Sequence, residues 1–593
     1  MAHASSASPA PGTGPGARTG TGRGSTGVSG GSWVRAWRQR VSKQPRVVRR
    51  APSWGAVAGA CLCYCLSLTP SLLPRSWWLQ GLCAGITGAI GYAIGAALGA
   101  GVGFVLGRLN RRPGARVRRI AWGVLAVLAL LGIVAITVRS ARWQSEVRRA
   151  VTASPQVSGW SWWLVPVVAL LVGGVLVLLA RLLRLGTGLV AHSLSPLVPR
   201  PVAYTMGVAV VVFVTVGVVQ GFLLSAALDV AESAASLTDS GTPPGIVQPK
   251  LATLSGSPAS GESWDSLGSK GREFVGEAPT RAEIAAFGGR PAMDPVRVYT
   301  GLRSADTLDG RAAKAVAELV RAGGFDRKVL AVLATTGSGW VNRQSGTPLE
   351  YMYGGDSALV AMQYSYLPSW VSVLTEDEAA DAGKALFDAV YAKWSTLPPA
   401  SRPKLVVYGE SLGSYATEEA FGGDLARLSA HTDGALLVGP TFDNPMWQHL
   451  TKEREPGSPA WRPVVQQGRT VRFAQVPSDL AVPDAPWHTP RTVYLQNGSD
   501  PIVWWSPGLF LNSPDWLDRP RAADVSSAMR FYPVVTFWQV ACDLVDANGV
   551  PPGHGHRYGT MPTTAWAAMI PPPGWTAADT ARLKTLMAGL GGT

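Results

Sequence analysis

Acidic side chains are almost missing from the first 228 residues of this 593-residue chain, where Glu146 stands alone against 23 lysines and arginines. The remainder of the chain is mildly acidic, so the formal charge of +15 belongs to one half only. The basic residues flank long apolar runs, which is typical of a membrane protein with arginine-rich cytoplasmic loops. This distribution argues against nucleic-acid binding, and no nucleic-acid partner is expected.

Cysteine is also scarce. Of five cysteines, only Cys542 falls in the polar half, while Cys61, Cys63, Cys65 and Cys83 lie inside apolar runs. This excludes a disulfide framework or a paired-cysteine metal site in the polar half. On a spanning helix the side chains of the C-x-C-x-C segment point in diverging directions, so they are interpreted as small membrane-buried residues. Neither a metal nor another cofactor is expected.

Long apolar runs fill the first part of the chain, at residues 54–73, 77–107, 120–138, 162–185 and 203–228. Each is near or above the ~20 residues that a helix needs to cross the hydrocarbon core. We therefore predict a transmembrane helical domain over residues 54–228 with about five helices. The second run has a glycine at every fourth position from Gly91 to Gly107, which predicts close packing against another helix of the chain.

Orientation follows from the arginines. Residues 1–53 are rich in Gly, Ser and Pro and then in arginine, which predicts a disordered, basic cytoplasmic tail. The 108–119 loop is equally basic and is expected in the cytoplasm. Five crossings then place everything after residue 228 outside the cell, in a multi-pass plasma-membrane protein. The 139–161 loop argues against this, because it would be external and yet holds four arginines.

The polar half alternates between two patterns. Residues 229–290 are predicted to be a linker, and residues 291–593 a catalytic domain. Strand-like runs lie at 296–300, 328–335, 369–374, 404–408, 434–438 and 491–496, and helical patterns at 309–322, 355–364, 376–394 and 414–427. This alternation predicts a mostly parallel sheet covered by helices, an α/β fold whose ligand site lies beyond the carboxyl ends of the strands.

Gly409-Glu410-Ser411-Leu412-Gly413 lies between the strand at 404–408 and a helical run. This is the strand–turn–helix context of the G-x-S-x-G nucleophile elbow, in which side chains at either glycine would clash. By itself the pentapeptide is weak evidence for a nucleophile, because a chain with 68 glycines can contain this pattern by chance. An inert, glycine-lined strand end is the alternative, and partners elsewhere in the chain must decide between the two.

Candidate partners follow in the order that α/β-hydrolases use, serine, then acid, then histidine. Asp500, after the strand at 491–496, is the predicted acid, with an Asx turn that caps its own loop as the alternative. The glycine-rich loop at 551–559 supplies the base; His556 is favoured, because an aromatic residue stands two places later, and His554 is the second choice. A metal held by the two histidines is disfavoured, since no carboxylate or cysteine cluster accompanies them.

The oxyanion of an acyl-transfer reaction requires two backbone N–H groups. Leu412, directly after the serine, is predicted to supply one. The other is expected from Thr336 or Gly337, in the loop after the strand at 328–335. A plain turn or a phosphate-binding loop are the alternatives for that loop, although the lysine of a P-loop is missing.

Aromatic residues crowd the predicted mouth of the site, and core packing is the alternative for most of them: Tyr351, Tyr353, Tyr364, Tyr366, Trp370, Trp504 and Trp505. The candidate substrate-binding residues are Trp340, Trp504 and Trp505. Two adjacent residues of an extended segment cannot both face one core. At least one of Trp504 and Trp505 is therefore expected at the surface or in a cleft, where it would suit an apolar acyl chain or a lipid.

Several segments resemble a membrane-anchored α/β-hydrolase family of actinobacteria, whose members join a multi-helix membrane region to a C-terminal hydrolase domain. They are 263–275 (SWDSLGSKGREFV), 336–341 (TGSGWV), 350–370, 408–421 (YGESLGSYATEEAF), 491–507 and 551–559 (PPGHGHRYG). The resemblance covers about 54–580. It implies a serine-hydrolase triad of Ser411, Asp500 and a histidine of the 554–556 pair, without a firm substrate. The gap between Asp500 and His556 is longer than in ordinary α/β-hydrolases, and a helical insertion at about 522–546, a candidate lid, is expected to fill it.

The predicted function is that of a membrane-embedded serine hydrolase. It would be an esterase, lipase or acyltransferase that forms an acyl-enzyme on lipid or cell-envelope acyl esters, with membrane lipids as its partners. The alternative is a catalytically inactive hydrolase fold used as a membrane scaffold or receptor. A transporter is disfavoured, because no ionisable residue lies in the middle of a crossing.

Overall fold

The computed structural model describes residues 51–110, 113–154, 159–218, 236, 238–367 and 376–590. Three predicted features therefore lie wholly or largely outside the described residues. They are the tail at 1–53, the end of the last apolar run at 219–228, and the strand at 369–374.

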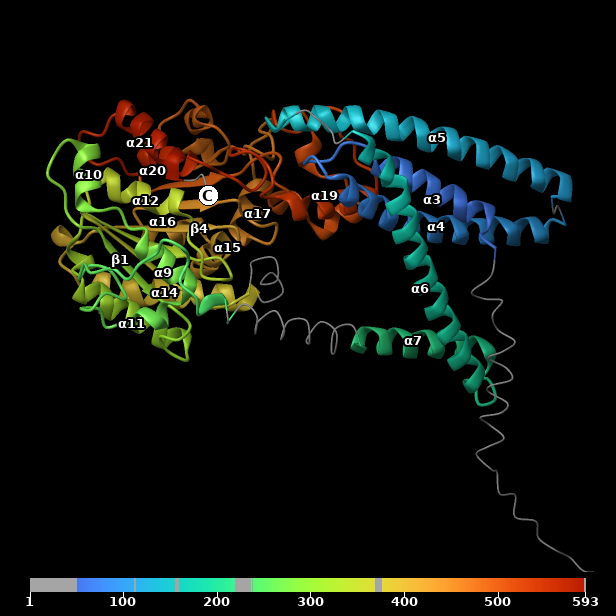
Figure 1. Ribbon diagram of the computed structural model, residues 1–593, viewed down its shortest axis with the longest axis horizontal. Coiled ribbons are helices and arrows are strands. Elements are labelled where there is room, and N and C mark those ends of the chain that lie inside the picture. Colours follow the sequence, from blue (N-terminus) through green and yellow to red (C-terminus); the bar gives the residue numbers. More distant parts are fainter. Residues whose placement is uncertain are drawn as a thin grey trace, which may run out of the picture. The chain divides into compact units, whose positions relative to one another are not determined.

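In the apolar half, the described residues form the helices α3 (Trp54–Ser67), α4 (Trp77–Arg108), α5 (Ala115–Ala150), α6 (Val165–Leu194) and α7 (Arg200–Val218) (Figure 1). The last four are long and apolar enough to cross a membrane. With 14 residues, α3 is about 21 Å long, short of a hydrocarbon core of ~30 Å. The helix ends at Ser67, although the predicted apolar run extends to residue 73, because a residue that precedes a proline, here Pro70, disfavours the helical conformation.

Glycines bring α3 and α4 into backbone contact. A Cβ on Gly59 would lie 2.2 Å from the carbonyl oxygen of Gly91, and one on Gly95 would lie 2.1 Å from that of Gly55. The first part of the glycine stripe, at Gly91 and Gly95, is thus used for packing within the chain, as predicted, whereas Gly103 has no neighbour within 4 Å.

The C-terminal part of α5 continues beyond its apolar stretch. Trp162 Nε1 donates to Ser140 Oγ at 2.9 Å, and the backbone N–H of Arg75 donates to Gln144 Oε1 at 2.9 Å. The helix has 36 residues, about 54 Å, which is more than a bilayer requires. The four arginines of the predicted 139–161 loop therefore stand on a helical extension that packs against its neighbours.

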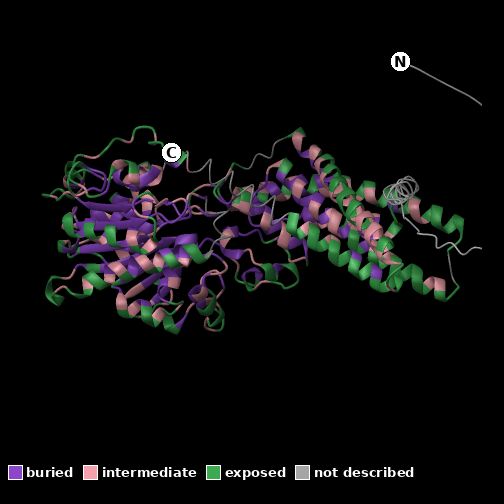
Figure 2. Ribbon diagram, turned by 90° about the horizontal axis from the view of Figure 1, so that it is seen from below, coloured by how far each residue is buried: buried purple, intermediate pink, exposed green. Residues whose placement is uncertain are grey.

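The polar half is built on a seven-stranded, wholly parallel sheet in the order β1-β3-β2-β4-β5-β7-β6. The strands are β1 (Val296–Thr300), β2 (Val329–Ala334), β3 (Ser357–Met362), β4 (Lys404–Glu410), β5 (Gly434–Val438), β6 (Val471–Ala474) and β7 (Arg491–Leu495). Nearly every strand residue is buried (Figure 2), as expected when helices cover both faces. All carboxyl ends therefore meet at one edge of the sheet.

Alternate strand residues pack into two cores. One face carries α11 (Leu308–Arg321), α14 (Glu376–Ser395), α15 (Leu412–Ala420), α16 (Leu425–His431) and α17 (Pro445–Lys452). The other carries α9 (Gly268–Gly276), α10 (Arg281–Gly288), α12 (Arg343–Met352), α20 (Met561–Met569) and α21 (Ala577–Leu590). The molecule thus has the predicted fold class, a helical, membrane-type region followed by an α/β-hydrolase-like domain.

Three predicted elements differ from the structure. The helix predicted at 355–364 is wrong, because residues 357–362 of this stretch form strand β3, which lies between β1 and β2. The four-residue strand β6 was not predicted. The helix predicted at 414–427 is two helices, α15 and α16, which are separated at Gly422 and Gly423, both with φ values near +65°.

Between Asp500 and His556 the predicted insertion is only partly helical. Its helix is α19 (Val535–Asp543), followed by a 3₁₀ turn at Leu544–Asp546, and it packs on α3 and α4. The fully buried Arg75 and Asp543 form an ion pair at 2.7 Å, and the Gln539 amide donates to the carbonyl of Thr69 at 3.0 Å. The insertion is therefore docked on the membrane-type helices and not disposed as a free lid.

Candidate active site

Ser411 stands at a strained turn between β4 and α15, with φ 56° and ψ −125°. A Cβ on Gly409 would lie 2.1 Å from the Gly413 carbonyl oxygen, and one on Gly413 would lie 2.4 Å from that of Ala334. Both positions therefore require glycine, as the nucleophile-elbow interpretation predicts. Such backbone conformations cost ~1–3 kcal/mol and persist where the surroundings impose them.

Asp500 and His556 form a buried pair. His556 Nδ1 lies 2.7 Å from Asp500 Oδ2, and the side chains are 7% and 0% exposed. The other carboxylate oxygen of Asp500 accepts from the Ile502 N–H at 2.9 Å, at the start of α18 (Pro501–Trp504). Asp500 thus caps its own loop and also faces the imidazole, so it makes the contacts that both interpretations require.

The same sheet edge brings His556 and Ser411 together. The Ser411 N–H donates to the carbonyl of Val438, the last residue of β5, at 2.8 Å. The next residue, Gly439, faces the imidazole, since a Cβ there would lie 2.5 Å from His556 Cε1. Among the described residues, His556 Nε2 is buried and has no hydrogen-bond partner. A basic nitrogen therefore lies unengaged beside the turn that carries the serine.

Residues 296–583 match the alpha/beta-hydrolase family, and residues 68–279 match the N-terminus family of alpha/beta-hydrolases. The chain belongs to the alpha/beta-hydrolase family. Searches of curated proteins and of solved structures return no match. Because the two matched regions nearly adjoin, the membrane-type helices and the sheet domain of this alpha/beta-hydrolase form one family architecture.

Tyr558 is a functional candidate that the sequence analysis missed. Its hydroxyl donates to Asp500 Oδ2 at 2.6 Å, the same oxygen that faces His556. In the sequence, Tyr558 only helps to favour His556 over His554 as the base. Its own contact with Asp500 depends on how the loop folds, which the sequence pattern does not reveal. Tyr558 holds the carboxylate of this hydrolase in place from the side opposite its capped oxygen.

Two opposing effects set the pKa of His556. Burial by itself lowers it, but the charge and the hydrogen bond of Asp500, with a smaller contribution from Glu410, outweigh burial. The net result is a pKa above the ordinary value, because the charged imidazolium is stabilised more than it is desolvated. The imidazole is thus suited to holding a proton taken from a nucleophile.

His554, the second choice for the base, faces a different carboxylate. Its Nδ1 lies 3.3 Å from Asp524 Oδ2, and the same oxygen accepts from Ser499 Oγ at 2.6 Å. The Gly555 N–H in turn donates to Ser499 Oγ at 2.9 Å. This cluster ties the loop of Asp500 to the loop of His556. Asp524 was not predicted, since only the fold brings it here.

The predicted oxyanion donors differ in availability. Leu412 is the first residue of α15, so its N–H has no partner inside the helix. The Thr336 N–H donates to the Trp340 carbonyl at 3.2 Å and is therefore engaged. The Gly337 N–H has no partner among the described residues. Leu412 and Gly337 are thus the pair that the geometry leaves open, and Thr336 is not.

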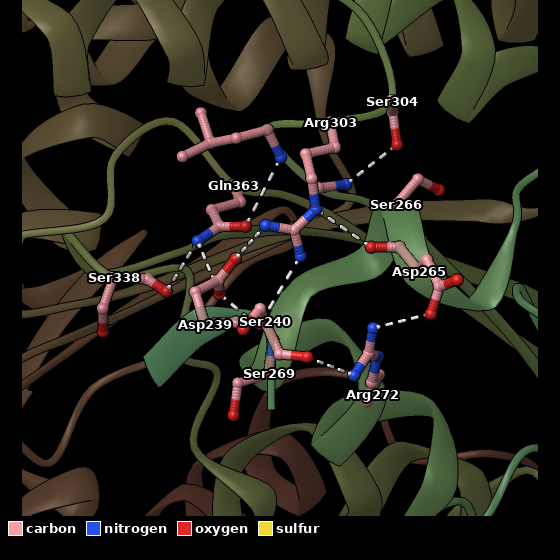
Figure 3. Close-up of polar contacts among 12 residues, drawn as sticks. Asp239, Ser240, Asp265, Ser266, Ser269, Arg272, Arg303, Ser304, Ser338 and Gln363 are labelled. Atoms are coloured by element: carbon pink, nitrogen blue, oxygen red, sulfur yellow. Dashed lines mark hydrogen bonds and ion pairs between the residues drawn. The ribbon is translucent and has the colours of Figure 1, made fainter. Parts of the chain in front are cut away.

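Buried side chains hold the 335–340 loop (Figure 3). The Gln363 amide donates to the Ser338 carbonyl and to Asp239 Oδ1, both at 3.3 Å. In addition, the Tyr299 hydroxyl donates to the Gly339 carbonyl at 2.8 Å. Asp239 also pairs with Arg303 at 3.2 Å. Because Asp239 belongs to the predicted linker at 229–290, part of that linker supports the loop beneath the candidate oxyanion hole.

Glu410, directly before Ser411, is a second buried carboxylate of the site. It accepts from Asn342 Nδ2 at 2.9 Å and from the Tyr408 hydroxyl. Burial raises the pKa of Glu410, and the Tyr408 hydrogen bond, the charge of His556 and the Asn342 amide only partly oppose this rise. Asn342 is also the N-cap of α12, so Glu410 fastens the elbow to the loop that precedes this helix.

The three candidate tryptophans take three different positions. Trp340 lines a small cavity with Lys270 and Glu277, on α9 and just beyond it. Trp504 is 4% exposed, its Nε1 donates to the Asn497 carbonyl at 2.9 Å, and it packs in the core, so its assignment as a substrate contact is wrong. Trp505 is half-buried against Phe442. One tryptophan of the adjacent pair is thus internal and the other is partly exposed, although the segment is the end of helix α18 and not extended as the sequence analysis assumes.

Proposed function

We propose that this alpha/beta-hydrolase is a serine hydrolase that cleaves or transfers acyl esters through an acyl-enzyme on Ser411. The observation that carries the proposal is the His556 imidazole, whose Nδ1 is engaged by Asp500 while its Nε2 is unpartnered beside the Ser411 turn. A histidine held in this way can serve as the base for a neighbouring hydroxyl.

In the proposed reaction, His556 Nε2 takes the Ser411 proton as Oγ attacks the acyl carbonyl. Asp500 keeps the Nδ1 proton in place and stabilises the imidazolium, with Tyr558 bonded to the same oxygen. The N–H groups of Leu412 and Gly337 receive the oxyanion. Collapse breaks the ester bond, and His556 returns its proton to the departing alkoxide. Water or an acceptor alcohol then attacks the acyl-enzyme by the reverse proton transfers.

Lipid or cell-envelope acyl esters are the proposed substrates. Four helices long and apolar enough to cross a membrane belong to the same chain as the site, and α19 docks the hydrolase domain directly on α3 and α4. Attachment to the bilayer raises the effective concentration of substrates that reside in it.

For the location, we propose the plasma membrane with the hydrolase domain outside. The first turns of α4 contact α19, whereas the arginine-rich 108–119 segment follows the opposite end of α4. A basic segment at the far end of a spanning helix indicates that the far side is cytoplasmic. Single cysteines at Lys250 and Gly114, both exposed, test this with a membrane-impermeant maleimide in spheroplasts. Labelling of K250C alone supports the proposal, and labelling of G114C alone refutes it.

The enzymatic proposal is tested by labelling full-length protein in detergent with a fluorophosphonate probe, which reacts with activated serines. The wild type and Ser513→Ala, which changes an exposed serine outside the site, should label equally, and Ser411→Ala should not label. Labelling that persists in S411A would remove Ser411 as the nucleophile. A wild type that never labels and turns over no ester would favour the inactive scaffold or receptor.

A further inference from the structure

Five aromatic side chains form a continuous band at the surface between the candidate active site and the membrane-type helices. The band consists of Phe442, Trp505, Phe510, Phe537 and Trp538. Ring centroids lie 5.3 Å apart for Phe442–Trp505, Trp505–Phe537 and Phe537–Trp538, and 5.6 Å apart for Phe510–Phe537. No member is fully buried. This is unlike a core cluster such as Trp447, Trp504 and Trp516, which are all buried.

One end of the aromatic band lies at the site. Phe442 belongs to the loop that follows β5. This loop begins with Gly439, which packs against the His556 imidazole. Trp505 ends the short helix that begins directly after Asp500. The rings therefore start on the two loops that supply the surroundings of the candidate base.

The other end lies at the membrane-type helices. Phe537 and Trp538 stand on α19 next to Gln539, whose amide donates to the backbone carbonyls of Ser67 at 3.2 Å and Thr69 at 3.0 Å, where α3 ends. Phe510, 40% exposed, and Leu511, 68% exposed, flank α19 on a neighbouring loop. The band therefore ends on α19, the helix that packs on α3 and α4.

Two indole N–H groups in the band lack acceptors. Trp505 Nε1 and Trp538 Nε1 are both buried, and neither has a hydrogen-bond partner among the described residues. Buried donors without partners are rare. By contrast, the neighbouring core tryptophans are satisfied: Trp447 Nε1 donates to Gln496 Oε1 at 2.7 Å, and Trp504 Nε1 to a backbone carbonyl. Both nitrogens are enclosed by their neighbours, so an acceptor reaches them only when the rings part to admit a ligand, and a molecule with a long apolar part and a few oxygen acceptors fits this requirement.

We infer that the aromatic band binds a membrane lipid from the leaflet beside α3 and α4 and guides its ester toward Ser411. The inference rests on the proposed function and specifies its substrate as a bilayer-resident acyl ester that reaches the site sideways and not through water. The acyl chain packs along the rings, and the indole N–H groups of Trp505 and Trp538 donate to ester or headgroup oxygens. Tryptophan and phenylalanine at a membrane boundary suit this role, since their rings are apolar and the indole carries one donor.

A binding experiment that needs no catalysis tests the inference directly. Full-length S411A protein is placed in nanodiscs that contain a phosphatidylglycerol with a photoreactive diazirine near the end of one acyl chain, and adducts are mapped by mass spectrometry. The inference predicts adducts on peptides 505–511 and 535–538 in addition to α4–α7. Adducts confined to α4–α7 would overturn it, whatever the outcome for Ser411 as a nucleophile.

A kinetic experiment adds a matched control. In Phe510→Ser with Leu511→Ser, both changes are at exposed positions, so the fold should be kept. We expect turnover of a long-chain ester in vesicles to fall about tenfold more than turnover of a short, water-soluble ester, because binding to lipid follows the apolar area that is buried. Val320→Ser, at a 52% exposed valine on α11, should change neither. Equal losses on both esters, or no loss on the vesicle ester, would contradict the inference.

The indole donors are tested separately by Trp505→Phe, which keeps a ring and removes the N–H. The expected result is a KM for the vesicle ester raised by about fivefold, the equivalent of one hydrogen bond, with a smaller change for the short ester. An unchanged KM for the vesicle ester would remove Trp505 as a donor. If no variant, including the wild type, turned over either ester, the proposed function would fail, and the photolabelling result would still decide whether the band binds lipid.

Discussion

Two histidines, two residues apart on one loop, each face a buried carboxylate, yet their surroundings differ. His556 lies 2.7 Å from Asp500, and its second ring nitrogen is buried and has no partner in the part of the chain that the structure describes. His554 lies 3.3 Å from Asp524, and its side chain is 16% exposed. The carboxylate that it meets already accepts two hydrogen bonds from Ser499.

The comparison shows that an aspartate–histidine contact does not by itself indicate a catalytic pair. What distinguishes His556 is its other ring nitrogen, which is buried without a partner among the described residues, on an imidazole that packs against Gly439. Asp524, in contrast, accepts hydrogen bonds from the backbone and side chain of Ser499 and also faces His554. It therefore connects the loop of Asp500 to the loop of His556. The same residue types thus leave an imidazole nitrogen unpaired in one place and tie two loops together in the other.

The largest expected effect separates the two histidines. His556→Ala should reduce ester turnover by about 10⁴-fold or more, because the base is lost, whereas His554→Ala should cost about tenfold or less. Turnover of a soluble ester by the full-length protein in detergent measures both. A severe loss confined to H554A would reverse the assignment.

Next come the two carboxylates. Asp500→Asn keeps the shape of the side chain but removes the charge that holds the imidazole in the required tautomer, so a loss in kcat of about 10³–10⁴-fold is expected. Asp524→Asn should lower kcat about tenfold at most. Similar losses for D500N and D524N would show that the two pairs do not differ in role.

Asp524→Asn also has a stability signature. The exchange keeps an oxygen acceptor for Ser499 but buries an amide NH₂ where Asp524 Oδ1 has no partner among the described residues, and a buried donor without a partner costs ~1–3 kcal/mol. Faster thermal inactivation of D524N than of wild type is expected, with the pH dependence of its remaining activity unchanged. A shifted pH profile together with unchanged thermal inactivation would assign Asp524 to the chemistry instead.

A smaller effect is expected from Tyr558→Phe, which removes one donor to Asp500 Oδ2 and keeps the ring. The loss of one hydrogen bond of about 1 kcal/mol predicts turnover reduced about fivefold. The double variant Y558F/D500N should be no worse than D500N alone, because Tyr558 acts through Asp500. Additive losses in this cycle would mean that Tyr558 has a separate role.

The pH profile is the most delicate test. The base must be neutral to accept a proton, so activity is present above the pKa of His556 and is lost as the pH falls through it. Since Asp500 raises that pKa, the acidic limb of the rate of fluorophosphonate labelling should have its midpoint above about 6.5, the ordinary histidine value. The midpoint should fall in D500N and stay in D524N. Movement in D524N alone would indicate His554 as the base.

Much of the fold could be predicted from the sequence where periodicity and length agree. The long apolar runs at 77–107 and 120–138 and the strands around Ser411 have unambiguous patterns. The segment at 357–362 (SALVAM) does not, because a six-residue apolar run of alanine, leucine and methionine suits a buried strand and a helix equally. Only its place between β1 and β2 makes it a strand.

The candidate site was predictable as far as its residues follow a linear order. Ser411, Asp500 and His556 succeed one another along the chain at the ends of recognisable elements. Asp524 and Tyr558 have no such pattern, since their significance depends on contacts that form only when the loop after β7 meets the loop before α20. The prediction of Thr336 as an oxyanion donor was wrong for a related reason. Its N–H donates to the carbonyl of Trp340, and no spacing rule reveals that contact.

The buried ion pair of Arg75 with Asp543 has a consequence for anyone who wishes to work with the hydrolase alone. Burial raises the pKa of Asp543, and Arg75, from the apolar half, opposes that rise. A fragment that begins after the last membrane-type helix would keep Asp543 but lose Arg75. It would also expose to solvent the side of α19 that packs on α3 and α4. We expect such a soluble fragment to misfold or aggregate. The segment between Asp500 and His556, which contains α19, therefore folds correctly only when the membrane-type helices are present.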